Sequence, residues 1–147
     1  MELIRNFFRY AKDFEKTYKD DDWSRLEPYL SLHAIYRVEN VPFACEIEGR
    51  QAILTAIRRS CDGFDRKGTR QVGLLKEPRE EASRVILYGF VEYSFPEKAT
   101  LRLNAQTVAE YEEGSIRSLV DTYDEGSAEI CKAWFRQNGD GLDPSYR

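Results

Sequence analysis

Apolar side chains recur every three or four positions through the first nineteen residues, which is the spacing of one face of a helix. They are Leu3, Phe7, Ala11, Phe14 and Tyr18. Three aspartates, residues 20–22, follow and can accept hydrogen bonds from the free N–H groups of a short second helix, residues 23–30. The pattern therefore predicts two consecutive helices, the first ending near Lys19.

The period changes to two after this helical segment. Residues 31–39 and 42–48 alternate between apolar and polar side chains, and the turn-forming Asn40 and Pro42 separate them. This pattern predicts an antiparallel strand pair. Helical spacing returns after Gly49, and a glycine at position 63 or 68 offers a stop for a third helix.

The second half of the chain is rich in strand-like runs. Four such runs, separated by short turn sequences, cover residues 69–77, 83–95, 100–112 and 115–125. They predict an antiparallel meander, followed by a short helix from Ser127 to about Gln137. Residues 138–147 are rich in Gly and Asp, so we expect one domain over residues 1–137 and a flexible tail over residues 138–147.

Charge and composition narrow the class of protein. Charged residues make up 33% of the 147 positions, the net charge is −4, and basic residues are interspersed among acidic ones, so no nucleic acid partner is expected. The first residues lack an apolar signal segment and no long apolar run occurs, which predicts a cytoplasmic protein that does not bind membranes. Cys45, Cys61 and Cys131 share no metal-binding spacing, and no phosphate-binding glycine loop is present, so neither a metal nor another cofactor is expected.

The order of these elements resembles the NTF2-like superfamily, in its SnoaL-like (polyketide cyclase-like) branch. Three stretches carry the resemblance: DDDWSRLEPYLSLHAIYRVE, IEGRQAILTAIRRS and YEEGSIRSLVDTYDE. The resemblance implies an α+β cone, in which a curved antiparallel sheet wraps around the N-terminal helices and leaves a hydrophobic pocket on its concave face. The superfamily includes isomerase-like, dehydratase-like, epoxide hydrolase-like and cyclase-like enzymes as well as members without known chemistry, so it leaves the function open.

Asp121 is the first candidate for chemistry. The resemblance places it where many enzymes of the superfamily hold a pocket-facing carboxylate on the last strand. Alternation puts Leu119 and Tyr123 on the same face, and a carboxyl group between them should be partly desolvated, which raises its pKa toward neutral pH. The alternative is a hydrogen-bonded structural acid at the end of a strand.

Glu92 and His33 are the other candidates. Glu92 could pair with Asp121 as two carboxylates do in the epoxide hydrolase-like branch, but that branch has an arginine two residues before its acid, where this chain has Phe90. A solvated position on a strand is the alternative for Glu92. His33, the only histidine, could act as a base if it faced Asp121, or could simply form local hydrogen bonds. The proton-donating acid of isomerase-like members is replaced by Thr107 or the neighbouring Gln106.

Two functions remain open at this point. One is a non-catalytic pocket that binds a small apolar molecule, and the other is an acid/base enzyme of isomerase, dehydratase, cyclase or hydrolase type that uses Asp121. The first is favoured because each catalytic arrangement of the superfamily is incomplete here. The residues expected to line the pocket are Tyr10, Phe14, Tyr18, Tyr36, Phe90, Leu119 and Tyr123.

A homodimer through the sheet is also expected. The strand from Val85 to Phe95 carries apolar side chains on both of its faces, and only one face can meet the core of the same domain. Three charged residues, Arg84, Glu92 and Arg102, could instead interrupt this surface and keep the chain monomeric.

Overall fold

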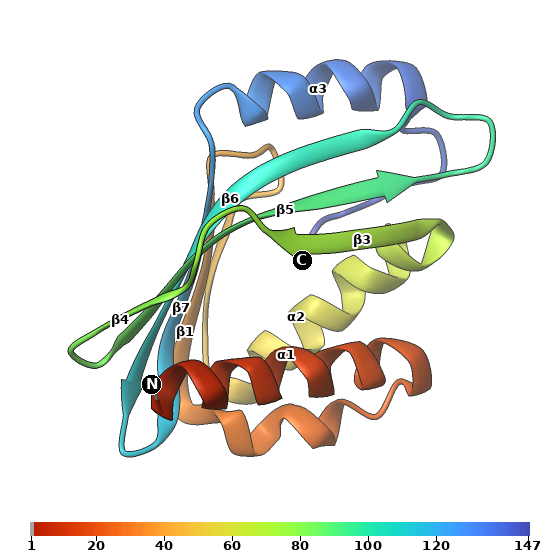
Figure 1. Ribbon diagram of the computed structural model, residues 1–147. Helices are drawn as coiled ribbons and strands as arrows, with labels where there is room; N and C mark the ends of the chain where they lie inside the picture. Colours follow the sequence, from red (N-terminus) through yellow and green to blue (C-terminus); the bar gives the residue numbers. More distant parts are fainter. Residues whose placement is uncertain (1) are drawn as a thin grey trace.

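Helices cover the concave side of a curved sheet in the computed structural model, which describes residues 2–147 (Figure 1). In chain order the helical elements are α1 (Glu2–Asp20), the 3-10 helix η1 (Trp23–Tyr29), α2 (Arg50–Gly63), the 3-10 turn η2 (Asp65–Lys67) and α3 (Ser127–Asn138). The strands are β1 (Leu30–Glu39), β2 (Cys45–Glu48), β3 (Thr69–Leu74), β4 (Arg79–Glu81), β5 (Arg84–Ser94), β6 (Leu101–Glu112) and β7 (Ser115–Tyr123). The expected α+β cone is therefore confirmed.

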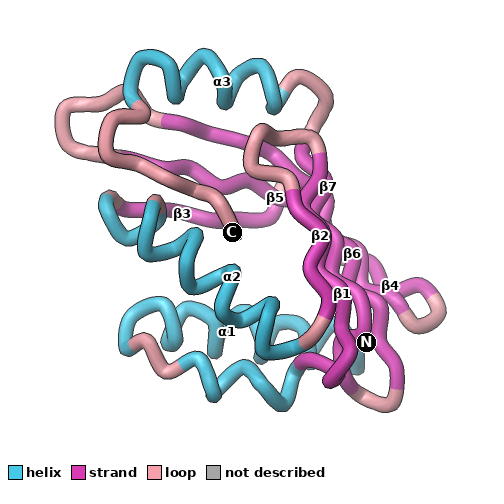
Figure 2. The backbone as a smooth tube through the Cα atoms, turned by 180° about the vertical axis from the view of Figure 1, so that it is seen from behind, coloured by secondary structure: helices cyan, strands magenta, loops and turns pink. Residues whose placement is uncertain are grey.

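The seven strands form one sheet in the order β2-β1-β7-β6-β5-β3, and β4 pairs with β5 outside this path. Seen from behind, β2 lies at the edge of the sheet beside β1 (Figure 2). The sheet is mixed rather than wholly antiparallel as expected, because β1 and β7 run parallel. Neighbours joined by a short turn must run antiparallel, whereas β1 and β7 are separated by α2 and the whole meander, so the chain can enter both strands from the same end.

A tight hairpin fixes the register of the last two strands. Glu113 and Gly114, between β6 and β7, both have positive φ values, 52° and 83°, as a two-residue type I′ turn requires. The turn and one bulge place Thr107 of β6 opposite Asp121 of β7. Because side chains alternate along a strand, these two residues point to the same face of the sheet.

This shared face is the concave one, and α1 and α2 pack against it. The two helices contribute buried side chains such as Phe7, Tyr10 and Ile53 to a single hydrophobic cluster that includes the inward side chains of the strands. Leu26 of η1 is fully buried in the same cluster. In contrast, α3 lies across the far end of the sheet, away from α1 (Figure 1).

The C-terminal residues, for which the sequence predicts a flexible tail, lie against α2 in the structure. Past α3 the chain forms no helix or strand, but it runs back along α2 and packs there. The Asp143 amide donates to the Gly63 carbonyl at 2.9 Å, and the Ser60 hydroxyl donates to the Pro144 carbonyl at 2.6 Å. The Gly and Asp content of this segment predicts a loop, but its apolar side chains, above all Tyr146, pack against the core.

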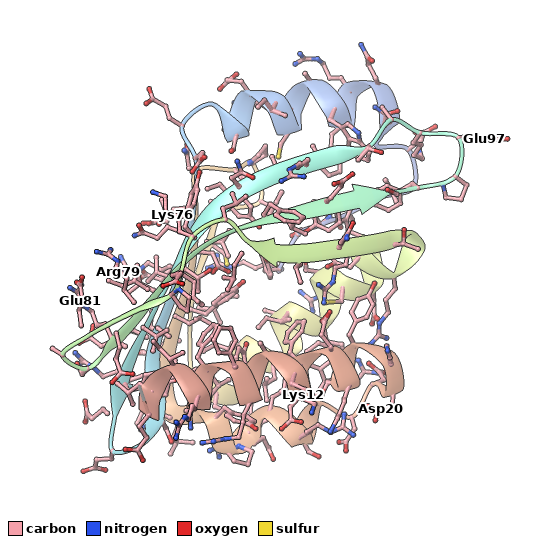
Figure 3. All side chains as sticks on the ribbon, in the orientation of Figure 1. Lys12, Asp20, Lys76, Arg79, Glu81 and Glu97 are labelled. Carbon is pink, nitrogen blue, oxygen red and sulfur yellow. The ribbon has the colours of Figure 1, made fainter. Side chains whose placement is uncertain are left out.

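Charged side chains lie around the outside of the fold. The six that Figure 3 labels belong to exposed positions on α1, the β3–β4 connection, β4 and the β5–β6 turn. No helix within residues 2–147 combines the length and the apolar character needed to cross a membrane.

Candidate ligand pocket

A cavity of about 360 Å³ lies between α1, α2 and the concave face of the sheet. Helix α1, the end of α2, strands β1, β3, β5, β6 and β7, and the C-terminal segment all contribute to its wall. The lining residues are Phe7, Tyr10, Ala11, Phe14, Glu15, Tyr36, Phe43, Ile57, Ser60, Cys61, Phe64, Asp65, Arg70, Val72, Tyr93, Thr107, Leu119, Asp121, Pro144 and Tyr146. Eight of the twenty lining residues are aromatic, and polar side chains gather around Asp121 and around Arg70.

The first polar group surrounds Asp121. The Thr107 hydroxyl donates to Asp121 Oδ1 at 2.7 Å, and the Tyr36 hydroxyl donates to Asp121 Oδ2 at 3.2 Å. Burial raises the pKa of Asp121, and these two hydrogen bonds oppose the rise because they stabilise the charged form. Both described partners of the carboxyl group are neutral.

Tyrosine hydroxyls extend this polar group toward the C-terminal segment. The hydroxyl oxygens of Tyr36 and Tyr146 are 3.5 Å apart, and the two rings meet edge to face. Burial raises the pKa of both phenols, as it does for Tyr10 of α1. These hydroxyls therefore stay protonated at neutral pH and can donate to Asp121 or to a bound molecule.

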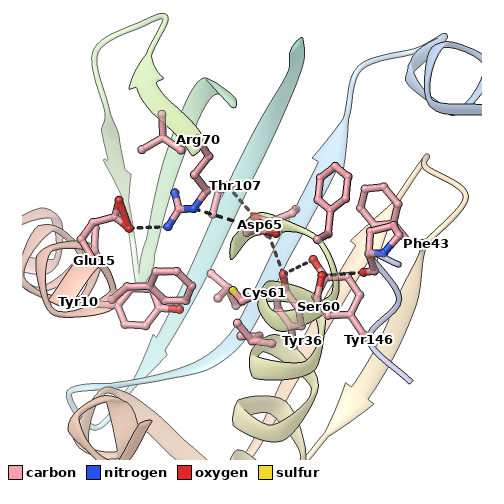
Figure 4. A pocket seen from close by; sticks show the side chains of 18 of the residues that line it. Tyr10, Glu15, Tyr36, Phe43, Ser60, Cys61, Asp65, Arg70, Thr107 and Tyr146 are labelled. Carbon is pink, nitrogen blue, oxygen red and sulfur yellow. Dashed lines mark hydrogen bonds and ion pairs between the residues drawn. The ribbon is translucent and has the colours of Figure 1, made fainter. Parts of the chain in front are cut away.

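The second polar group is an ion cluster centred on Arg70 of β3. Its guanidinium lies between two carboxylates, with Nη2 at 2.5 Å from Glu15 Oε2 and Nε at 3.3 Å from Asp65 Oδ2 (Figure 4). It also stacks on the rings of Phe14 and Tyr18, at 5.7 and 4.6 Å from their centroids. Only 8% of the Arg70 side chain is exposed, so its charge is balanced inside the protein and not by water.

Asp65 in this cluster is strongly perturbed. Burial raises its pKa from 3.8 to about 6, and the nearby charge of Arg70 only partly opposes the rise. The geometry accounts for this result, because Glu15 is the closer partner of Arg70 and Asp65 faces the guanidinium through a longer, less aligned contact. Asp65 therefore changes its charge close to neutral pH.

A second cavity of about 400 Å³ opens from the first toward solvent, between α1 and the strands β3 and β5. The two cavities share Phe14, Arg70 and Asp121 among their lining residues, so they adjoin each other. Phe8 and Leu74 line this outer part and are 42% and 47% exposed. An apolar molecule therefore meets an apolar rim at the mouth.

Most of the residues expected to line the pocket lie around this space. Tyr10, Phe14, Tyr36 and Leu119 line the inner cavity, and Tyr123 lines the outer one. Tyr18 lies behind the wall, where it stacks with Arg70. Phe90 borders the outer cavity only, because alternation turns it to the convex face, where the Arg102 guanidinium lies 4.0 Å from its ring centroid.

The three candidate catalytic residues do not converge. Asp121 faces the cavity, but Glu92 has the same parity as Phe90 and forms an ion pair with Arg102 at 3.5 Å on the convex face. His33 is exposed on β1, next to the irregular pairing between Leu30 and Ile35, and lines neither cavity. The pairing of Asp121 with Glu92 or His33 is therefore absent from the structure.

Sequence reasoning missed the ion cluster and the role of the C-terminal segment in the wall. Glu15, Asp65 and Arg70 come from three different elements, and only the strand register shows that Arg70 points inward with Val72. The alternation of side chains along β3 could have indicated that Arg70 and Val72 share a face of the sheet. Within residues 2–147, no group of three or more His, Cys, Asp or Glu side chains has an arrangement that could hold a metal ion.

No protein-family model and no curated protein matches this sequence. Solved structures with similar folds do exist. One is an LEH-like epoxide hydrolase from M. tuberculosis, 19% identical, with a TM-score of 0.62 over 90% of this chain and 91% of the other. Another is an NTF2-like protein from Burkholderia xenovorans, 13% identical, with a TM-score of 0.63 over 88% and 95% of the two chains.

A third similar structure is a hypothetical protein with a ketosteroid isomerase-like fold from Catenulispora acidiphila, crystallised in complex with trimethylamine. It is 14% identical to this chain and gives a TM-score of 0.63 over 92% of this chain and 94% of its own. Identities this low carry no information about activity, but the coverage is nearly complete in each case. The chain therefore has the NTF2-like fold.

Proposed function

We propose that the protein binds a small, largely apolar organic molecule in the cavity between α1, α2 and the sheet, and that it does so without transforming it. The observation that carries this proposal is the cavity itself, which is enclosed by aromatic side chains and has a few polar groups converging around Asp121. Such a combination is typical of small-molecule sites. The similar fold that was crystallised with trimethylamine supports a pocket of this kind.

Binding without catalysis is favoured by the arrangement of the charged groups. Neither Glu92 nor His33 faces Asp121, and Arg70 is held by Glu15 and Asp65. A general acid or base needs a partner that orients the reacting group or stabilises developing charge. Asp121 has only neutral hydroxyl donors beside it.

The alternative function is acid/base catalysis by Asp121 on a small apolar substrate. One observation favours it, because burial raises the pKa of Asp121 and the carboxyl group faces the cavity. A carboxyl group with a raised pKa has a higher affinity for a proton and is therefore a stronger general base than an ordinary carboxylate. The similar fold of the LEH-like epoxide hydrolase also supports this alternative.

A fragment-binding experiment tests the pocket. Ala11 lines both cavities, so Ala11→Trp fills the space without removing a buried side chain. Ala133→Trp is the matched control, because Ala133 is exposed on α3. We expect small aromatic and aliphatic fragments, screened by ligand-observed NMR, to bind the wild type and Ala133→Trp and to be lost in Ala11→Trp. Equal binding to all three proteins would contradict the proposal.

Further expectations from the sequence remain proposals. We propose that the chain belongs to the SnoaL-like branch and acts in the cytoplasm without a nucleic acid partner, on the basis of its three resembling stretches and its dispersed charge. We also propose a homodimer through the convex face of the sheet. Phe90, Val108 and Val120 are half-buried there and supply apolar surface, although ion pairs such as Arg102 with Glu92 border it.

A further inference from the structure

We infer that the ligand of this cavity is an organic cation with an apolar body, either a protonated amine or a quaternary ammonium ion, and that Asp121 is its counter-charge. This inference rests on the proposed function, because it names the chemical class of the molecule held in the same pocket. It goes beyond that proposal because it gives the ligand a positive charge and names Asp121 as the residue that pairs with it.

The balance of charge in the cavity wall is the first support. Three carboxyl residues, Glu15, Asp65 and Asp121, line the cavity together with a single basic residue, Arg70. Arg70 is already bound to Glu15 and Asp65. The positive charge of Arg70 is therefore paired within the ion cluster, and the carboxyl groups of the wall outnumber its basic groups.

Asp121 is the second support. A carboxylate withdrawn from water is costly unless a cation pairs with it, yet the side chains that donate to Asp121 among the described residues are the neutral hydroxyls of Thr107 and Tyr36. Its remaining exposed surface faces the cavity. A ligand ammonium group placed there would supply the missing cation.

The aromatic wall is the third support. Aromatic rings attract cations through their electron-rich faces, and cages of such rings recognise quaternary ammonium groups. Tyr10 and Tyr146 lie close enough to Asp121 for its negative charge to contribute to the rise of their pKa values. The cavity already holds one cation in this way, because the Arg70 guanidinium stacks on Phe14.

An anionic ligand fits these contacts poorly. To bind Arg70 it would have to displace Glu15 or Asp65 from the guanidinium and leave a carboxylate without its partner. A neutral ligand avoids that cost but gives Asp121 no counter-charge. The wall therefore selects for positive charge.

Three probes of similar size test the inference on the wild-type protein. They are (3-hydroxyphenyl)trimethylammonium, its neutral isostere 3-tert-butylphenol, and the anion 3-tert-butylbenzoate. Their dissociation constants are measured by NMR titration at neutral pH. We expect the cation to bind at least about tenfold more tightly than the neutral isostere, and the anion to bind most weakly.

Asp121→Asn tests the residue assigned to the charge. Asparagine keeps an oxygen that can accept from Thr107 but loses the negative charge, so the preference for the cation over the neutral isostere should largely disappear. Glu92→Gln is the matched control, since it removes a carboxylate from the convex face, and should keep the preference. Circular dichroism checks that both variants fold, and the three-probe comparison on the wild type does not depend on them.

The outcomes separate this inference from the proposed function. If the neutral isostere binds as tightly as the cation, or the anion binds best, the inference is overturned while the pocket stands. A preference for the cation that survives Asp121→Asn overturns the role of Asp121. If none of the three probes binds at millimolar concentration, the inference fails, and the fragment comparison with Ala11→Trp decides independently whether the pocket binds small molecules.

Discussion

Asp65 should make the stability of this protein depend on pH in an unusual direction. Burial raises its pKa from 3.8 to about 6 in the folded protein. A carboxyl group whose folded pKa lies above its unfolded value stabilises the fold fully below the unfolded pKa, and this stabilisation is lost as pH rises through about 6. Most carboxyl groups act in the opposite sense, because pairing lowers their pKa in the folded state.

The magnitude follows from the size of the pKa difference. A difference of about 2 corresponds to about 3 kcal/mol between the low-pH limit and pH values well above 6, at 1.36 kcal/mol for each tenfold change. Between about pH 5 and about pH 7 the Asp65 contribution alone should fall by about 1 kcal/mol. Asp20, Asp21 and Glu80 have lowered pKa values, so their contributions are lost at pH values below this window.

Urea denaturation of the wild type and Asp65→Asn across this window measures the effect. Asparagine cannot ionise, so the free energy of unfolding of Asp65→Asn should lose about 1 kcal/mol less than that of the wild type between about pH 5 and about pH 7. Asp121 also has a raised pKa, but it is present in both proteins and cancels in the comparison. Asp62→Asn, which removes an exposed carboxylate of the same segment, is the control. Parallel pH profiles for the wild type and Asp65→Asn would refute the desolvation argument.

Three other predictions concern stability and assembly. Leu26→Ala, at a fully buried position, should lower the free energy of unfolding by about 2 to 5 kcal/mol. His33→Asn, at an exposed position, should change it by less than about 0.5 kcal/mol. Denaturation curves that reverse this order would show that the helix faces are misassigned. Tyr146→Ala should destabilise the fold by about 3 kcal/mol, because the Tyr146 ring packs on Tyr36 and Phe43. Tyr146→Phe keeps the ring and should melt at nearly the same temperature as the wild type. Equal effects of the two variants would contradict a packed C-terminal segment. Light scattering at micromolar concentration should give twice the mass of one chain, and a mass near 17.2 kDa would refute the homodimer.

The sequence predicted most of the elements because each of these has its own periodic signal. It missed β4, which lies in a stretch interpreted as a turn, because three residues are too few to show a period. The spacing of Phe7, Ala11 and Phe14 marks α1, and the turn at Gly114 marks the last hairpin. Alternation from that turn also indicated correctly that Asp121 shares a face with Leu119. These features depend on neighbours along the chain, so local patterns are sufficient to find them.

The rest of the site depends on contacts between distant elements. Glu92 could not be assigned a face without the register of β5 against β6, and that register turns it away from Asp121. The ion cluster joins Glu15 of α1 to Arg70 of β3, which are 55 positions apart. Tyr146 lies in a segment whose composition predicts a loop, and its packing is visible only once α2 and β1 are in place.

The charge of the ligand and the possibility of catalysis are linked through Asp121. A cation bound beside this carboxyl group favours its ionised form and so lowers its pKa, which opposes the effect of burial. A carboxyl group held in its ionised form has no proton to donate, and it is also a weaker base, because its affinity for a proton has fallen. A neutral ligand leaves the raised pKa in place and keeps Asp121 able to exchange a proton. A substrate without positive charge therefore favours acid/base catalysis by Asp121, whereas a bound organic cation disfavours it and favours binding alone.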